Sequence, residues 1–317
     1  MNEGFYSFPT PIKRSSSDIA VFDQTGVYHI QPGVKALYIF AAAAGSGGGG
    51  GARQATATNA YGGAGGSGGS TGLYYFQAED LGGPGSSLFV VIGAGGSGGA
   101  AATGDSTNGS NGVVGGITEV FTLGRGTSVQ VNASLSTLLY MPQPFPGYGA
   151  GGTTASAASG GTGPYGAELI YYAGSPGSTG AVSAGSVSLY TMQQCGGAGG
   201  GGHLAGSATA GGSININVAT TIPQTVGIDT AKNSAVYSGG SINSATGPTN
   251  SAMQTFGLFS PGFGGAGGGG GTTVAATNGA NGYRGSGGGG GGGSANGFAA
   301  GKGGNGGNGF VAIKAIY

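Results

Sequence analysis

Runs of glycine interrupted at every third residue are the feature that most restricts how this chain can fold. Glycine supplies 82 of the 317 residues. Residues 62–70 read GGAGGSGGS, residues 93–100 read GAGGSGGA, and residues 301–309 read GKGGNGGNG. Within each run the residues that carry a side chain lie three apart. This period matches the polyproline-II helix, which has three residues per turn.

Such helices must find hydrogen-bond partners outside themselves, because a polyproline-II helix has no internal hydrogen bonds. Glycine at two of every three positions leaves two faces of bare backbone. Neighbouring helices can then approach closely enough for N–H···O and Cα–H···O bonds between them. Collagen, the competing structure of period three, needs one glycine per triplet and far more proline than the 12 residues present. The runs therefore predict a bundle of polyglycine-II helices.

Short apolar or alternating segments beside the glycine runs predict β-strands, and no segment reads as an α-helix. The expected fold class is mainly β, with strands or a small sandwich capping the polyglycine-II bundle. The turn at Gln31-Pro32-Gly33 is predicted to join two strands into a hairpin. The predicted strands are Ile19–Phe22, Gly26–Ile30, Val34–Ala42, Leu88–Ile92, Ile117–Leu123, Ser186–Met192, Ile214–Val218 and Phe310–Tyr317.

The expected domain organisation is a short N-terminal segment, residues 1–17, followed by one glycine-rich domain over residues 18–317. That domain contains a long insert with few glycine runs at residues 203–263. Segments richer in side chains are expected to form exposed loops at the ends or edges of the bundle. These segments are residues 52–61, 71–80, 100–114, 140–148, 164–175, 203–263 and 272–284.

The charge balance argues against several functional classes. Nine basic and nine acidic residues give a formal net charge of zero, so the chain lacks the basic stripe that a nucleic-acid backbone requires, and we expect no nucleic-acid partner. No apolar stretch reaches the eighteen residues typical of a membrane span, and the N-terminus lacks the apolar run of a signal peptide, so membrane insertion is not expected. A single cysteine, Cys195, cannot form an intrachain disulfide or a cysteine-based metal site.

Two motifs of enzymes occur inside glycine runs, and we interpret both as consequences of glycine abundance. Gly93, Gly95 and Gly98 have the G-x-G-x-x-G spacing of dinucleotide-binding proteins, but the sequence that follows has no apolar stripe of helical period. Ser67 lies in a G-x-S-x-G pattern, which any serine in a glycine run would satisfy. Neither motif predicts a site.

Other polar residues give equally little support for chemistry. Only His29 and His203 could serve a Ser-His-Asp site. Residues 105–112 (DSTNGSNG) offer oxygen ligands without the spacing of an EF-hand. We therefore expect no catalytic residues, no metal and no cofactor.

Aromatic residues in the segments between the runs are the candidates for binding. Tyrosine offers a large contact area and a hydrogen bond at low entropic cost. About half of these rings are expected to pack over the bundle or the sheets. The candidates are Tyr74, Tyr75, Phe145, Tyr148, Tyr171, Tyr172, Phe256 and Phe259.

Three stretches carry a resemblance to a known family: QPGVKALYIFAAAAGSGGGGG (residues 31–51), GGPGSSLFVVIGAGGSGG (residues 82–99, followed by GGITEVF at 115–121) and GGNGGNGFVAIKAIY (residues 303–317). Over about residues 17–317 the chain resembles the glycine-rich domain of bacteriophage tail-fibre and receptor-binding proteins. The resemblance implies a stiff polyglycine-II scaffold at the tip of a virion tail, exposed to the medium. It also implies that the aromatic loops would contact a host surface protein or glycan.

The same resemblance implies attachment to other virion tail proteins, for which an extended N-terminal peptide is suited. The docking candidates are Phe5, Tyr6, Phe8, Pro9 and Pro11. A homotrimer is possible, and the sequence does not decide between monomer and trimer. A purely structural virion component is the main alternative function. An ice-binding or extracellular surface protein and an enzyme are weaker alternatives.

Overall fold

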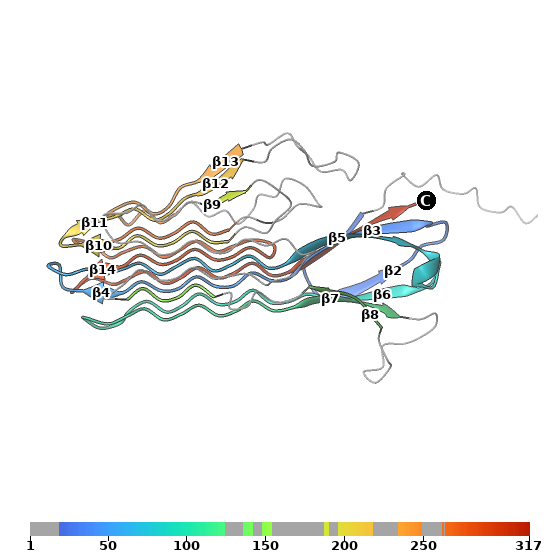
Figure 1. Ribbon diagram of the computed structural model, residues 1–317, viewed down its shortest axis with the longest axis horizontal. Coiled ribbons are helices and arrows are strands. Elements are labelled where there is room, and N and C mark those ends of the chain that lie inside the picture. Colours follow the sequence, from blue (N-terminus) through green and yellow to red (C-terminus); the bar gives the residue numbers. More distant parts are fainter. Residues whose placement is uncertain are drawn as a thin grey trace, which may run out of the picture.

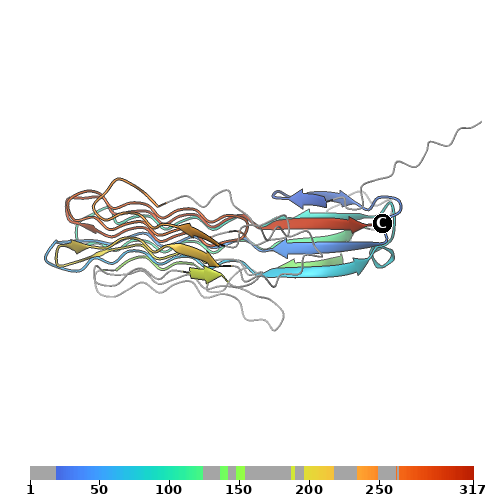
Figure 2. The ribbon, with the colours of Figure 1, turned by 90° about the horizontal axis from the view of Figure 1, so that it is seen from above.

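The computed structural model describes residues 19–123, 136–141, 148–153, 187–189, 196–217, 234–248, 262 and 264–317. Figure 1 shows an elongated molecule with a β-sandwich at one end and a bundle of extended segments that forms the remainder of its length. The view from above in Figure 2 shows the same division. The described residues contain no α-helix, and their one helical element is the 3-10 turn η1 (Glu79–Leu81). The mainly β fold predicted from the sequence is confirmed.

Two four-stranded sheets form the sandwich. Every neighbouring pair of strands in these sheets is antiparallel. The first sheet has the order β1 (Ile19–Phe22), β15 (Phe310–Ile316), β3 (Ala36–Ala42) and β5 (Thr71–Gln77). The second has the order β2 (Gly26–His29), β6 (Ser87–Val91), β7 (Thr118–Leu123) and β8 (Ser136–Met141).

The core of the sandwich lies between the two sheets, as the alternation of side chains along each strand requires. Leu37 and Ile39 of β3, with Val311 and Ile313 of β15, pack in one buried cluster with residues of the second sheet such as Leu88. The opposite face of the first sheet holds a second buried cluster of Phe40, Ala42, Phe310 and Ala312. Together, the cluster between the two sheets and this second cluster form the hydrophobic core of the molecule.

The bundle is built from extended segments with a hydrogen-bond period of three, which we call glycine helices. In residues 45–52, the amides of Gly45, Gly48 and Gly51 donate to one neighbour, residues 301–307. The next amide in each triplet donates to residues 61–67, and the third donates to residues 107–113. Carbonyls of the same helix accept bonds from residues 96–102, 149–152 and 288–294. Successive amides of one helix therefore donate to different neighbouring helices, and every third amide donates to the same neighbour. This is the polyglycine-II arrangement predicted from the sequence.

The interior of the bundle has no room for most side chains. A Cβ atom added at Gly47 would overlap the carbonyl oxygen of Ser97, and one at Gly51 would overlap that of Gly292. Small side chains are tolerated where a gap exists: Ala64, Ser67 and Ser70 are fully buried in an inner helix. In the outer helices the third residue faces solvent, as at Ser97, Asn305 and Asn308. The glycine backbone is therefore itself the packed core of the bundle.

Successive glycine helices run in opposite directions. The partners of residues 45, 48 and 51 descend from 307 to 301, so these two helices are antiparallel. The partners from residues 96–102 ascend, so that helix runs parallel to residues 45–52. The chain thus travels away from the sandwich, turns, and returns to it. Loops consequently alternate between the two ends of the bundle.

Short strands complete the bundle. The pair β4 (Arg53–Gln54) and β14 (Ser294–Ala295) and the hairpin β10 (His203–Leu204) and β11 (Ser207–Ala208) lie at the end opposite the sandwich (Figure 1). A further sheet has the order β13 (Ser234–Tyr237), β12 (Ile214–Asn217) and β9 (Val187–Leu189). Residues 209–212, within the predicted insert, join the bundle through bonds such as Gly212 N–H to the carbonyl of Gly199 (2.9 Å).

Two details of the sequence prediction are wrong. The turn at Gln31-Pro32-Gly33 does not close a hairpin: β2 and β3 belong to different sheets, and the chain crosses the sandwich there with Gly33 at a φ of 86°. Several predicted loops are regular structure: residues 71–77 form β5, and residues 109–116 and 276–283 are glycine helices. Isolated glycines suffice in these helices, because only the positions that face a neighbouring helix must lack a side chain.

Candidate functional site

The loops at the far end of the bundle carry side chains that glycine packing does not confine. They comprise residues 53–60, 103–108, 203–208, 242–247, 272–275 and 296–299, which we call the tip. Bridges between Arg53 and Thr107, Ala60 and His203, and Gly271 and Ser294 hold these loops together. Figure 1 places the tip opposite the sandwich. A rod with these loop side chains at one end can present them to a partner.

A polar network centred on Arg53 orders one side of the tip. The guanidinium of Arg53 lies 2.7 Å from a carboxylate oxygen of Asp105, with Arg53 largely buried and Asp105 57% exposed. The same carboxylate accepts the amide of Gly297 (3.2 Å). Ser106 donates its hydroxyl to the Gln54 side chain (2.7 Å), and its amide donates to Asn296 (3.3 Å). Three loops distant in sequence are thereby fixed relative to one another.

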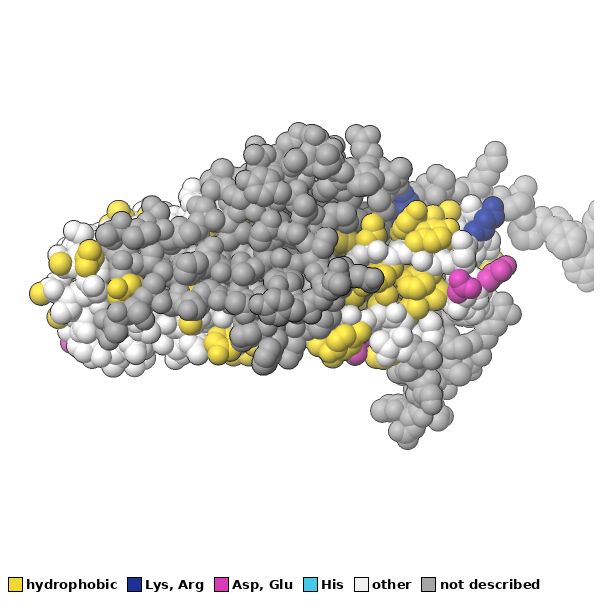
Figure 3. Space-filling model, viewed as in Figure 1, with side chains coloured by type: hydrophobic (Ala, Val, Ile, Leu, Met, Phe, Trp, Pro, Cys, Tyr) yellow, Lys and Arg dark blue, Asp and Glu magenta, His cyan; other side chains and the backbone are white. Residues whose placement is uncertain are grey.

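Exposed aliphatic side chains lie on other loops of the tip. Leu204 is 36% exposed, Ile242 48% and Val274 37%. Figure 3 shows hydrophobic atoms at this end of the molecule among mostly uncharged polar ones. The tip therefore combines apolar contact area with one ion pair, a composition suited to binding a protein or a glycan.

His203 is the buried ionisable residue beneath the tip. Its side chain is fully buried, and neither ring nitrogen reaches hydrogen-bond geometry with a protein group in the described part of the chain. Burial lowers the pKa of His203 below its ordinary value of 6.5, and nearby backbone groups of Ser294 and Gln54 oppose that shift only in part. A neutral imidazole is thus packed between the short strands of the tip.

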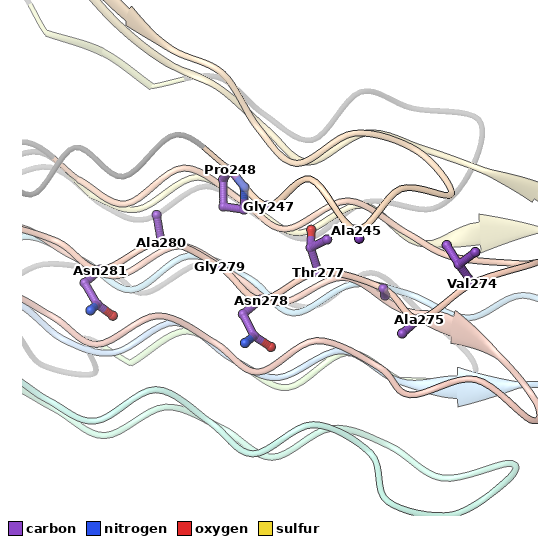
Figure 4. Close-up of a pocket in the computed structure, with 11 residues that line it drawn as sticks. Ala245, Gly247, Pro248, Val274, Ala275, Thr277, Asn278, Gly279, Ala280 and Asn281 are labelled. Carbon is purple, nitrogen blue, oxygen red and sulfur yellow. The ribbon is translucent and has the colours of Figure 1, made fainter.

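An apolar groove of about 700 Å³ lies between the loop that ends at Pro248 and the glycine helix at residues 276–283. In Figure 4, Ala280 points toward Pro248, whereas Asn278 and Asn281 point to the opposite side. The carboxamide oxygen of Asn278 accepts the amide of Lys302 (2.8 Å), and that of Asn281 accepts the amide of Asn305 (2.8 Å). The groove wall consists of small side chains and glycine backbone, without a charged group.

The two enzyme-like motifs have structural roles in the bundle. The amides of Gly95 and Gly98, which would bind a pyrophosphate in a dinucleotide site, donate instead to Asn308 and Asn305 side chains (2.9 and 2.8 Å). Ser67 is fully buried inside the bundle. His29 forms a hydrogen bond with Ser87 (Nδ1 to Oγ, 2.7 Å) on the exposed surface of β2 and β6. Among the described residues no group of three His, Cys, Asp or Glu side chains is placed to hold a metal ion.

The three aromatic candidates within the described residues, Tyr74, Tyr75 and Tyr148, do not lie in the tip loops. Tyr74 and Tyr75 lie in β5 of the sandwich, so their assignment to a loop is wrong: β5 pairs along its whole length with β3 and alternates in burial. Tyr75 packs against Tyr38, with ring centroids 5.0 Å apart, and Tyr74 stacks on Phe76. Tyr148 is exposed at the start of the helix at residues 148–153. The remaining candidates lie outside the described residues: Phe145, Tyr171, Tyr172, Phe256 and Phe259, together with Phe5, Tyr6, Phe8, Pro9 and Pro11.

Sequence reasoning missed Arg53, Asp105 and the exposed aliphatic residues of the tip, because it selected for aromatic side chains. The alternating direction of the glycine helices could have identified them. The first glycine helix leaves the sandwich at residue 45, so the loop after it, which begins at Arg53, must lie at the far end. The same reasoning places residues 103–108 and 296–299 beside it.

Comparison with known proteins supports a single assignment. No helix in the described ranges has the length and apolar character needed to cross a membrane. A search of curated proteins finds no match. The family model of a glycine-rich domain matches residues 21–316, which span both the sandwich and the bundle. The chain therefore belongs to this glycine-rich domain family.

Proposed function

We propose that this chain is a non-enzymatic protein of a bacteriophage tail, located at the tip of the tail or tail fibre, and that its tip binds a host surface receptor. The observation that carries the proposal is the separation of roles along the rod. Its bundle interior excludes side chains, while its far end displays polar and aliphatic groups on loops fixed by the Arg53–Asp105 pair. The sequence resemblance to receptor-binding tail proteins supplies the biological setting.

The sandwich end is proposed to face the virion and to contact other tail proteins. Its exposed apolar side chains include Ile19 and Val21 of β1 and Leu73 and Tyr75 of β5. Apolar side chains exposed on a sheet favour contact with another protein. In Figure 3 hydrophobic side chains gather over the sandwich on the face shown.

The test is adsorption of phage particles that carry variants of the tip. Replacing Leu204, Ile242 and Val274 together by Glu should reduce the adsorption rate to host cells, because apolar contact area is lost and charge is introduced. Val113→Glu is the matched control: Val113 is 53% exposed but lies on the side of the rod. Assembly is checked by the amount of the protein on purified particles. Normal adsorption of the triple variant would contradict the receptor role.

A purely structural virion component is the second candidate, and the exposed apolar side chains of the sandwich favour it. In that case substitutions at the tip leave adsorption unchanged. Replacing Leu73 and Tyr75 by Ser would then prevent incorporation of the protein into particles. Labelling the protein on intact particles and imaging them by electron microscopy distinguishes an exposed tip from a buried one.

A further inference from the structure

A second pocket lies at the junction between the sandwich and the bundle, at the end of the bundle opposite the tip. Its volume is about 390 Å³, within the range of pockets for small ligands. Asp23 and Gln24 of the turn between β1 and β2 form one wall. Tyr283 and Arg284 form another, and Asn305 and Asn308 line the helix that leads into β15. All of these side chains are polar or aromatic.

Arg284 has a guanidinium group with no counter-ion among the described residues. Its Cζ atom lies 5.0 Å from the ring centroid of Phe310 and 5.4 Å from that of Tyr283, so the two rings fix the group in place. Its Nη1 atom is buried and makes no hydrogen bond, and within the described residues Arg284 forms no ion pair. A ligand in the pocket cannot reach the buried Nη1, so a carboxylate or a phosphate oxygen would pair with the other nitrogens of this fixed guanidinium, which bond to no group in the described part of the chain.

The backbone at this position is a tight turn between two glycine helices. Arg284 has a φ of 44°, in the left-handed region that disfavours residues with a Cβ. It precedes Gly285 in a tight turn, which the bond from Ser286 N–H to the carbonyl of Tyr283 closes (3.1 Å). Glycine or asparagine would fit this turn with less strain. Ala205 adopts the same φ before a glycine, so the backbone alone does not require arginine, and the reason for this residue lies in the contacts of its guanidinium.

The other walls supply groups that bind hydroxyls. The side-chain oxygens of Asn305 and Asn308 accept backbone amides of Gly98 and Gly95. Their amide nitrogens make no hydrogen bond to the described part of the chain and are therefore available as donors. Asp23 offers a carboxylate that accepts hydrogen bonds from hydroxyl groups and repels a second negative charge.

We propose that this pocket binds an acidic sugar, a pyranose unit with one carboxylate and several hydroxyl groups. The carboxylate pairs with Arg284, and the hydroxyls bond to Asp23 and to the amides of Asn305 and Asn308. Repulsion from Asp23 disfavours inorganic phosphate, which carries more charge and fewer donors. The inference goes beyond the receptor role of the tip and does not depend on it.

Isothermal titration of the full chain with glucuronate tests this site. Binding in the millimolar range is expected, with glucose, inorganic phosphate and glycine each at least about tenfold weaker. Arg284→Gln should weaken glucuronate binding by about tenfold or more. Lys302→Gln is the matched control, because it removes a positive charge from the helix of Asn305 and Asn308 at a residue outside the pocket, and it should bind as the wild type does.

A second variant, Asp23→Asn, tests the pocket if Arg284→Gln fails to fold. Asp23 is exposed in a turn, so its substitution should leave folding intact. Asp23→Asn should weaken glucuronate binding and strengthen phosphate binding. The proposal is overturned if wild type fails to bind glucuronate or prefers glucose, phosphate or glycine. Equal losses of glucuronate affinity in Arg284→Gln and Lys302→Gln would also overturn it. So would an Asp23→Asn variant that binds glucuronate and phosphate as the wild type does.

Discussion

The carboxamide oxygen of Asn305 accepts the backbone amide of Gly98, 2.8 Å away on a neighbouring glycine helix. Asn308 binds Gly95 in the same way, one turn further along (2.9 Å). At the surface of the bundle a helix lacks some of the neighbours that an inner helix has. The asparagine side chain supplies the acceptor that a missing neighbour would have provided.

Removing this acceptor should destabilise the bundle slightly. Asn305→Ala leaves the Gly98 amide to water, and the free energy of unfolding should fall by about 1 kcal/mol. Lys302→Ala, one turn away on the same exposed face, should have little effect. Chemical denaturation measures both changes, and amide hydrogen exchange at Gly98 should accelerate only in Asn305→Ala. Equal exchange in the two variants would contradict the assigned role.

A single methyl group inside the bundle should be far more damaging. In Gly47→Ala the new Cβ overlaps the carbonyl oxygen of Ser97, which belongs to a backbone held by its own hydrogen bonds. We expect a loss of about 1–3 kcal/mol or more in the free energy of unfolding. Gly247→Ala is the matched control, because nothing lies within 4 Å of its added Cβ. A thermal melt of Gly47→Ala like that of the control would refute the close-packed interior.

The buried cluster on the outer face of the first sheet should respond as an ordinary hydrophobic core. Phe40 is 1% exposed and packs against Phe310 with ring centroids 5.3 Å apart. Phe40→Ala should lower the free energy of unfolding by about 3–5 kcal/mol. Leu73, its cross-strand partner on β5, is 38% exposed, so Leu73→Ala should cost much less. Denaturant titration of both variants checks the contrast, which would be absent if Phe40 were not enclosed.

The ion pair at the tip should contribute little to stability. Asp105 is more than half exposed, so water weakens its attraction to Arg53. Asp105→Asn should therefore change the free energy of unfolding by less than about 1 kcal/mol. A loss above about 2 kcal/mol would mean that the tip network supports the whole bundle. The measurement also shows whether tip variants can be interpreted without a correction for folding.

Acidification should destabilise the protein through His203. Burial lowers the pKa of His203 below 6.5 in the folded chain, so the unfolded chain binds the proton more tightly. The contribution of neutral His203 is complete above about pH 6.5 and is lost as the pH falls from there toward the folded pKa. His203→Phe should have a shallower decline in unfolding free energy across this interval. Identical pH slopes in the two proteins would contradict the prediction.

Much of the fold could be predicted from local sequence patterns. The period of three at residues 301–309 predicts both the helix type and the exposed face of Asn305 and Asn308. The crossing at Gly33 is not local, because the same turn residues serve a hairpin or a crossover, and the burial of Leu37 and Leu88 in one cluster between the two sheets decides between them. Arg53 and Asp105 of the tip were missed for a different reason: candidates were selected for aromatic side chains, although the alternating direction of the glycine helices places these loops together.

The rotation of hydrogen bonds around residues 45–52 has a mechanical consequence. Each bond joins two helices side by side, so it lies across the long axis of the rod. A pull along that axis loads many such bonds in shear at the same moment, instead of opening them one after another. The chain also doubles back at the tip and returns to the sandwich, so no helix can slide without dragging its neighbours. Force applied at one end is therefore transmitted to the other with little extension.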